Sequence, residues 1–289
     1  MVKNSCSAVV FLLLTIVSMH KSYAADRQEI NFLSFSNSFW QIYTVHDDGT
    51  NLQQISHSPV DKVHSSWSET HSEMLVNTNQ GKLLAYDLTS DGSTILEIGV
   101  QGMTDAVWSW NTKKVLFSLS IANSIDANDI WEVEISSGKR KRLTNMKHMQ
   151  HDPVWTHDEK NVVFVSGAGG QDHDLFLLET ATGATRQLTA GQRYHFEPAC
   201  SVNNEIAFSS NRSGDYEIWV CDLEGKRFEQ ITHTPGLDGQ PTWSPDGKRI
   251  AFISARGGYP ALWVINRDGS NARQISPEGM RCRGPAWSR

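Results

Sequence analysis

The residues from Pro241 to Ser254 read PTWSPDGKRIAFIS, and this phrase recurs along the chain in altered form. Its counterparts are HSSWSETHSEMLVNT from His64, DAVWSWNTKKVLFSL from Asp105 and DPVWTHDEKNVVFVS from Asp152. In each copy a Trp is followed by Ser or Thr, and an apolar run begins seven residues after the Trp. A unit repeated this often points to a fold built from copies of one small element.

The spacing of the repeat identifies the element. The anchor positions lie 41 to 47 residues apart, which agrees with the roughly 40–45 residues of a four-stranded propeller blade. Five anchors are Trp, and Cys in the sequence EPACSVNNEIAF fills the remaining position. The anchors are Trp67, Trp108, Trp155, Cys200, Trp243 and Trp287.

Each unit contains four short apolar runs separated by turn sequences such as PDGK at Pro245 and RDGS at Arg267. Helical spacing is nowhere sustained, so the pattern predicts an all-β chain. Trp287 is followed by only two residues, whereas the runs at 30–34, 41–45 and 52–56 lack an anchor strand before them. The N-terminal strands and the C-terminal strand should therefore share a blade. The sequence predicts a six-bladed β-propeller of four-stranded blades, in which closure hides the strand edges.

The first residues have the pattern of a secretory signal peptide. Lys3 precedes an apolar run from Ala8 to Met19, and the small residues of Ser22 to Ala24 follow. The run is too short for a membrane span of about 20 residues. We therefore expect a signal peptide at residues 1–24 and a single propeller domain at 25–289, exported to the periplasm without membrane insertion and monomeric.

Charge and cysteine content exclude some classes of function. The formal charge is −6 at pH 7, and removal of two lysines with the signal peptide makes the chain more acidic. An acidic protein without a basic cluster is a poor candidate for binding nucleic acid or anionic membranes. Three cysteines remain, and Cys200 and Cys221 should lie two strand spacings apart, roughly 9–10 Å. That distance exceeds the reach of a disulfide.

The candidate binding site follows from the register of the repeat. Three residues before the anchors, and at adjacent positions, polar and charged residues should ring the mouth of the central channel, just ahead of the innermost strands. The predicted binding residues are His64, Asp105, His151, Asp152, His195, Glu197, Asp238, Arg281 and Arg283. On the same face, the polar loops at 120–129 and 167–174 are the longest in the chain. Binding surfaces often lie on loops of a rigid scaffold.

The unit from Gln240 to Ser276 resembles the TolB-type propeller repeat, in the pattern W-S-P-D-G-K-x-I-A-F-x-S followed by L-W-V and Q-I-S. EIAFSSNRSGDYEIWVCDLEG from Glu205 is nearly as similar. TolB is a periplasmic protein whose propeller binds protein partners, including the peptidoglycan-associated lipoprotein. The resemblance implies a periplasmic binding propeller, although this chain has no room for the α/β domain that precedes the propeller in TolB.

Two classes of function stay open. The favoured one is a non-enzymatic module, without a cofactor, that binds a protein or peptide of the cell envelope on its channel face. The alternative is a metal-dependent lyase or hydrolase acting on an acidic glycan, with the ring of His and Asp residues as its site. Oligogalacturonate lyases, which hold a metal through histidines on a propeller, resemble this architecture, but their ligand motif does not match these positions. No nucleophile elbow or phosphate-binding loop occurs in the chain.

Overall fold

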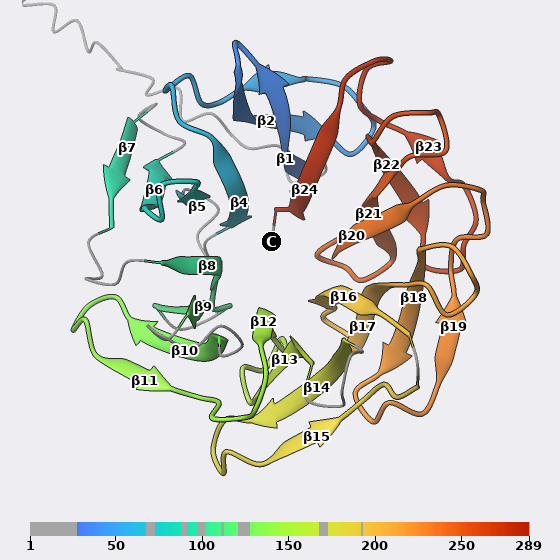
Figure 1. Cartoon of the computed structure of the whole chain (residues 1–289). Helices are drawn as coiled ribbons and strands as arrows, with labels where there is room; N and C mark the ends of the chain where they lie inside the picture. The colour runs from blue at the N-terminus through green and yellow to red at the C-terminus, as the bar shows by residue number, and fades with distance from the viewer. Residues whose placement is uncertain are drawn as a thin grey trace, which may run out of the picture.

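The fold is a closed ring of β-sheets around a central axis (Figure 1). The computed structural model describes residues 28–67, 73–87, 92–96, 102–110, 113–120, 128–167, 173–191 and 193–288. The predicted signal peptide lies outside these residues. Within them the chain forms 24 strands in six four-stranded sheets, and no helix in them could cross a membrane.

Each sheet is one blade, and in blades 2 to 6 the strands run outward from the axis in chain order, whereas in blade 1 the last strand of the chain is innermost. Blade 1 consists of β24 (Cys282–Trp287), β1 (Glu29–Ser36), β2 (Phe39–His46) and β3 (Gln53–Gln54). Blade 2 consists of β4 (Lys62–Trp67), β5 (Glu73–Thr78), β6 (Leu83–Asp87) and β7 (Gly92–Ile95). Blade 3 consists of β8 (Met103–Trp108), β9 (Lys114–Ser120), β10 (Asn128–Glu134) and β11 (Arg140–Arg142). Blade 4 consists of β12 (Gln150–Trp155), β13 (Asn161–Ser166), β14 (Asp174–Glu179) and β15 (Thr185–Gln187). Blade 5 consists of β16 (His195–Cys200), β17 (Glu205–Ser210), β18 (Glu217–Asp222) and β19 (Phe228–Gln230). Blade 6 consists of β20 (Asp238–Trp243), β21 (Arg249–Ser254), β22 (Ala261–Asn266) and β23 (Arg273–Gln274).

Blade 1 closes the ring as the repeat count predicts. The C-terminal strand β24 pairs antiparallel with β1, so that Ile30 faces Trp287 and Ser34 faces Cys282. Both ends of the folded chain therefore lie in one sheet, and β24 supplies the innermost strand that the N-terminal residues lack (Figure 1). The prediction of a shared blade is confirmed.

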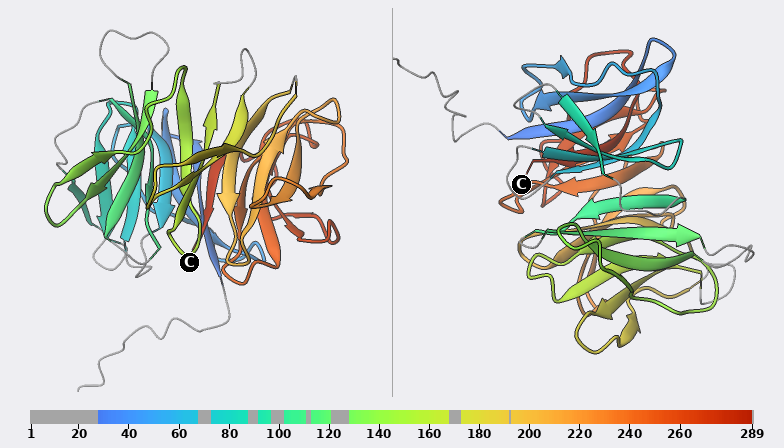
Figure 2. Two further views of the ribbon diagram at one scale, coloured as in Figure 1. Left: turned by 90° about the horizontal axis from the view of Figure 1, so that it is seen from below. Right: turned by 90° about the vertical axis from the view of Figure 1, so that its left-hand side faces the viewer.

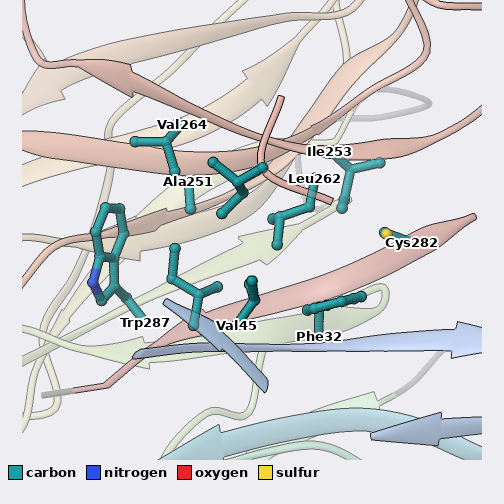
Figure 3. Close-up of a cluster of buried hydrophobic side chains, with 10 residues drawn as sticks. Phe32, Val45, Ala251, Ile253, Leu262, Val264, Cys282 and Trp287 are labelled. Atoms are coloured by element: carbon teal, nitrogen blue, oxygen red, sulfur yellow. The ribbon is translucent and has the colours of Figure 1, made fainter. Parts of the chain in front are cut away.

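The hydrophobic core lies between blades rather than within them. The second and third strands are apolar on both faces, as in NVVFVS of β13, because each face packs on a different neighbouring blade. Figure 3 shows one such layer, in which Phe32, Val45 and Trp287 of blade 1 meet Ala251 and Val264 of blade 6. There are six of these apolar clusters among the described residues, one at each junction.

The anchor residues of the repeat are core residues. Each of the six clusters contains one anchor, and all six anchors are at most 8% exposed. The indole N–H of Trp67 donates a hydrogen bond of 3.0 Å to the carbonyl of Ala286, and that of Trp243 donates one of 3.0 Å to Ala199. Each bond joins the innermost strands of two successive blades. The repeated Trp therefore packs blade against blade.

The three cysteines are buried and free, in agreement with the strand order predicted for Cys200 and Cys221. Cys200 on β16 faces Ile206 on β17, and Ile206 faces Cys221 on β18. An entire strand therefore separates the two sulfur atoms. Disulfides between these cysteines make no contribution to this fold.

A bulge in the innermost strands shapes the channel wall. Pairing shifts register in the middle of β8, β12, β16 and β20, where each strand pairs with the second strand of its blade. The residue at the bulge takes a left-handed backbone with φ between 51° and 56° in five of the six blades. These residues are Asp105, Asp152, Glu197, Gln240 and Gly284. A bulge re-aims a side chain and frees its amide from the sheet.

Candidate functional site

A cavity of about 990 Å³ lies on the axis, lined by the innermost strands and by the turn from Thr78 to Lys82 between β5 and β6. Five of the nine predicted binding residues line it, and Gln240, at the same register, joins them. The five are His64, Asp105, Asp152, Glu197 and Arg283. The predicted loops at 120–129 and 167–174 lie largely outside the described residues.

The register read from the sequence is correct, but the residues lie within the innermost strands and not ahead of them. Asp105, for example, is the third residue of β8, and Glu197 is the third residue of β16. The strands begin earlier than expected because their first residues, such as Met103, are buried at the blade junctions. The channel wall is therefore made of strand backbone with a bulge.

Three of the cavity residues hold neighbouring blades together. The carboxylate of Asp152 accepts a hydrogen bond from the amide of Glu197 at 3.4 Å. The carboxylate of Glu197 accepts one from the amide of Gln240 at 2.8 Å, and the side-chain oxygen of Gln240 accepts one from the amide of Gly284 at 2.7 Å. The left-handed bulge turns each amide toward the preceding blade, where the side chain of the equivalent residue meets it.

The environment of these acids separates their pKa values. Burial raises the pKa of Glu197, and the charge of Asp152 adds to that effect against the opposing hydrogen bond from Ser209. Burial would also raise the pKa of Asp152, but the hydrogen bond and charge of His151 and the charge of His64 lower it overall. Asp152 is therefore the carboxyl group that stays ionised to lower pH.

His64 and Asp105 differ from Asp152, Glu197 and Gln240, because in the described part of the chain their side chains form no hydrogen bond to a neighbouring blade. Within the described residues, the Nε2 atom of His64 is buried without a hydrogen-bond partner. The carboxylate of Asp105 accepts a hydrogen bond of 3.0 Å from the neighbouring hydroxyl of Thr104. Burial lowers the pKa of His64, while the charges of Asp105 and Asp152 oppose this. Both side chains line the cavity.

The two predicted arginines are not equivalent. Arg283 lines the cavity, but its guanidinium lies 3.9 Å from the centre of the Trp40 ring and donates a hydrogen bond of 2.9 Å to the carbonyl of Lys62. Arg283 thus joins blade 1 to blade 2. Arg281 precedes β24, is exposed and does not line the cavity. Replacement of Arg283 would therefore remove a contact between blades 1 and 2 as well as a charge from the cavity wall.

His151 lies beside the cavity in a small aromatic cluster. Its Nδ1 is 3.2 Å from the carboxylate of Asp152, and its Nε2 is 3.2 Å from Nδ1 of His173. Burial lowers the pKa of His151, but the hydrogen bond with Asp152 and the nearby carboxylates raise it overall. The rings of His151 and His173 both pack on Phe196.

His195 and Asp238 belong to the blade junctions instead of the cavity. Each is the first residue of an innermost strand and is at most 2% exposed. Nε2 of His195 lies 3.7 Å from the carboxylate of Asp174 in blade 4. Burial and then the charge of Asp238 raise the pKa of Glu217 in blade 5. Lys62, the first residue of β4, donates a hydrogen bond of 2.8 Å to Gln41 in blade 1. Polar side chains of successive blades thus meet at these three junctions, with different residues at each.

The metal hypothesis finds no preformed ligand set in the part of the chain that the structure describes. No three His, Cys, Asp or Glu side chains there come together in a way that could hold a metal ion. The HMQHD segment places His151 against His173 and Asp152, with His148 on a left-handed backbone of φ 68°.

The chain is similar to known proteins in its repeated sequence. Residues 175–289 match the family model described as the TolB beta propeller domain. The chain is 28% identical to the Protein TolB homolog of Chlorobium chlorochromatii over 149 residues, which is 50% of this chain and 33% of that protein. It is 30% identical over 146 residues to the Tol-Pal system protein TolB of Francisella tularensis subsp. tularensis strain SCHU S4, with the same two shares. The match thus spans about a third of the length of these curated relatives.

Solved structures agree in fold. The crystal structure of TolB from Acinetobacter baumannii superposes with a TM-score of 0.80 at 19% identity, covering 90% of this chain and 66% of that one. An oligogalacturonate lyase in complex with manganese superposes with a TM-score of 0.60 at 12% identity, covering 87% of this chain and 74% of the lyase. At these identities the likeness is one of fold alone.

Proposed function

We propose, from the premise that this chain is a TolB-like six-bladed β-propeller, that it is an exported protein of the periplasm that binds a protein or peptide partner in its central cavity. Export rests on the signal-peptide pattern of the first 24 residues. The relatives that carry the name Tol-Pal system protein favour a protein partner in the cell envelope.

One observation favours the central cavity over the opposite face of the propeller as the binding site. Among the charged groups of the cavity wall, His64 and Asp105 make no hydrogen bond to a neighbouring blade, and the Nε2 of His64 is buried without a partner in the described residues. An unpaired buried polar atom costs about 1–3 kcal/mol, which a ligand that pairs with it would recover. The cavity of about 990 Å³ is at the upper end of the usual range for ligand sites, roughly 300–1,000 Å³.

The charges of the cavity wall indicate which kind of partner would fit. Asp105, Asp152 and Glu197 lie on one arc of the cavity, and Lys82 and Arg283 lie on another. An extended peptide or loop that carries both basic and acidic groups would complement these charges. The bulged inner strands form a rigid frame for such a segment.

The test is capture of a partner from envelope extract with immobilised protein. We expect the double variant His64→Ala, Asp105→Asn to retain its thermal stability and to lose at least about tenfold in affinity, since one charge-assisted hydrogen bond contributes roughly 1.5–3 kcal/mol. Lys248→Ala, in the hairpin between β20 and β21 on the opposite face, is the matched control, because its side chain is 80% exposed.

Normal capture by the double variant together with loss of capture by Lys248→Ala would move the binding face to the opposite side. Metal analysis of the purified protein addresses the alternative function. A stoichiometric, tightly bound divalent ion would overturn a pure binding role and favour the metal-dependent enzyme.

A further inference from the structure

Blades 5 and 6 carry the same arginine in different surroundings. Arg212 and Arg256 each follow the second strand of their blade by two residues, after Ser210 and Ser254. Each guanidinium lies over the Trp of the third strand, with Arg212 4.8 Å from the centre of the Trp219 ring and Arg256 4.5 Å from that of Trp263. The two sites can therefore be compared residue by residue.

In blade 6 the arginine has an internal anionic partner. The guanidinium of Arg256 lies 2.7 Å from the carboxylate of Asp238, which is the first residue of β20 and fully buried. Asp238 faces Ser254 across the sheet. A planar guanidinium held against an aromatic face and paired with a carboxylate is a stable arrangement in a protein interior.

In blade 5 the equivalent carboxylate is replaced by an imidazole. His195 is the first residue of β16 and faces Ser210 as Asp238 faces Ser254. Burial and then the charge of Arg212 lower the pKa of His195 to about 4, so the imidazole is neutral. In the described part of the chain Arg212 stacks on Trp219 and Phe228, and its guanidinium forms neither an ion pair nor a hydrogen bond.

A pocket is lined by both His195 and Arg212. It has a volume of about 210 Å³ and is lined by Thr189, Ala190, Arg193, His195, Arg212 and Phe228. His195 is 2% exposed, and within the described residues neither of its ring nitrogens has a hydrogen-bond partner. The nearest acid to His195, Asp174 at 3.7 Å, already accepts hydrogen bonds from Thr189 at 2.8 Å and from Gln187 at 2.9 Å.

We infer that this pocket between blades 4 and 5 binds a small oxyanion, which replaces for Arg212 the carboxylate that Asp238 provides for Arg256. Arg212 offers paired N–H donors in the geometry that suits a phosphate, sulfate or carboxylate group. His195 forms part of the pocket wall without adding a charge, and Arg193 also lines the pocket. The site is separate from the central cavity, since the two share no lining residue.

Calorimetric titration of the full-length mature protein with inorganic phosphate, at constant ionic strength in chloride, tests the inference. A second titration with acetate tells a tetrahedral anion from a carboxylate such as a peptide terminus would carry. We expect saturable binding of at least one of these anions to the wild-type protein. The anion that binds more tightly shows whether the natural ligand carries a tetrahedral anion or a carboxylate.

Two variants and one control decide whether the pocket is responsible. Arg212→Gln removes the donor pair and should weaken binding at least tenfold. His195→Asp restores the carboxylate found in blade 6 and should also abolish binding, because Arg212 then has an internal partner. Arg227→Gln removes an arginine whose side chain is 87% exposed on the hairpin between β18 and β19 in the same blade, and it should bind as the wild type does.

Failure of the wild-type protein to bind either anion would overturn the inference. Equal binding by Arg212→Gln, with an unchanged thermal unfolding curve, would overturn it as well. If His195→Asp does not fold, the test rests on Arg212→Gln alone, since Arg212 is not part of the apolar cluster between blades 4 and 5. Neither outcome bears on the capture experiment at the central cavity.

Discussion

At the scale of single residues, the buried acid Glu217 makes the stability of the junction between blades 5 and 6 depend on pH. Burial raises the pKa of Glu217 to about 7, and the neighbouring charge of Asp238 contributes to the same shift. Its carboxyl group accepts a hydrogen bond from the hydroxyl of Thr232, which opposes the shift. Between about pH 4.3 and pH 7, the native protein therefore keeps a proton on Glu217 that the unfolded chain, with an ordinary pKa of about 4.3, has released.

The sign of the pH effect follows from this difference. Because the native state holds this proton more tightly than the unfolded chain does, the stabilising contribution is complete below the pKa of the unfolded chain and is lost as pH rises from about 4.3 to 7. Glu217→Gln removes the ionisation and keeps a hydrogen-bonding side chain. In urea unfolding between pH 4.5 and 7.5, we expect the wild type to lose up to about 3 kcal/mol relative to the variant. A constant difference in free energy of unfolding over that range would contradict the assignment.

At the scale of elements, the bulged innermost strands are joined by hydrogen bonds that pass from blade to blade. The amide of Gly284 in β24 depends on the side chain of Gln240 in β20, across 44 residues of sequence. The bulge residues of blades 3 to 6 keep a left-handed backbone although none of them is glycine. Such a conformation costs roughly 1–2 kcal/mol per residue, so the surrounding contacts must hold it in place.

A pair of alanine variants separates the hydrogen bond from the backbone strain. Gln240→Ala leaves the Gly284 amide without its side-chain acceptor and should destabilise the protein by about 1 kcal/mol. Asp105→Ala sits at the same bulge with nearly the same φ, but in the described residues its carboxylate accepts a bond only from Thr104. Denaturant unfolding should show a smaller loss for Asp105→Ala. Equal losses would mean that the blade-to-blade bond contributes nothing measurable.

At the scale of the whole molecule, stability depends on closure by β24. Deletion of residues 284–289 removes Trp287, which is 3% exposed in the cluster between blades 6 and 1, and exposes the edge of β1. Loss of a buried Trp side chain costs about 3–5 kcal/mol, against a total stability of about 5–15 kcal/mol. Thermal unfolding should show a much lower Tm or aggregation, and an unchanged curve in the truncated protein would refute the role of closure.

The fold could be predicted from the sequence because burial in a blade repeats with the chain. The Trp and Cys anchors recur at blade spacing because each fills the same space at a junction. The N-terminal strands lack an anchor strand before them, and the last anchor, Trp287, lies on the strand that completes their blade. The register of the channel residues, three positions before each anchor, was also visible in the sequence, whereas the bulge at that position was not. Which polar side chains face a ligand was not, because Gln240 and Arg283 contact partners on other blades that sequence spacing does not reveal.

Arg212 and Arg256 also show that sequence spacing alone does not reveal the partner of a polar side chain. Both arginines and their neighbours His195 and Asp238 are plain in the sequence, and His195 and Asp238 were read as members of one ring. Their difference has meaning only once the register places His195 and Asp238 at equivalent positions. Alignment of the repeats on the first residue of each innermost strand would have revealed it.

The pairing of β1 with β24 has a mechanical consequence. The two strands are antiparallel, so the start of β1 at Ile30 and the end of β24 at Trp287 meet at the same end of the ladder. A force that pulls the two termini apart would load the hydrogen bonds of this ladder one after another, from that end, and not all at once in shear. The ring should therefore resist heat through all six junctions together, yet open at low tension along a single seam.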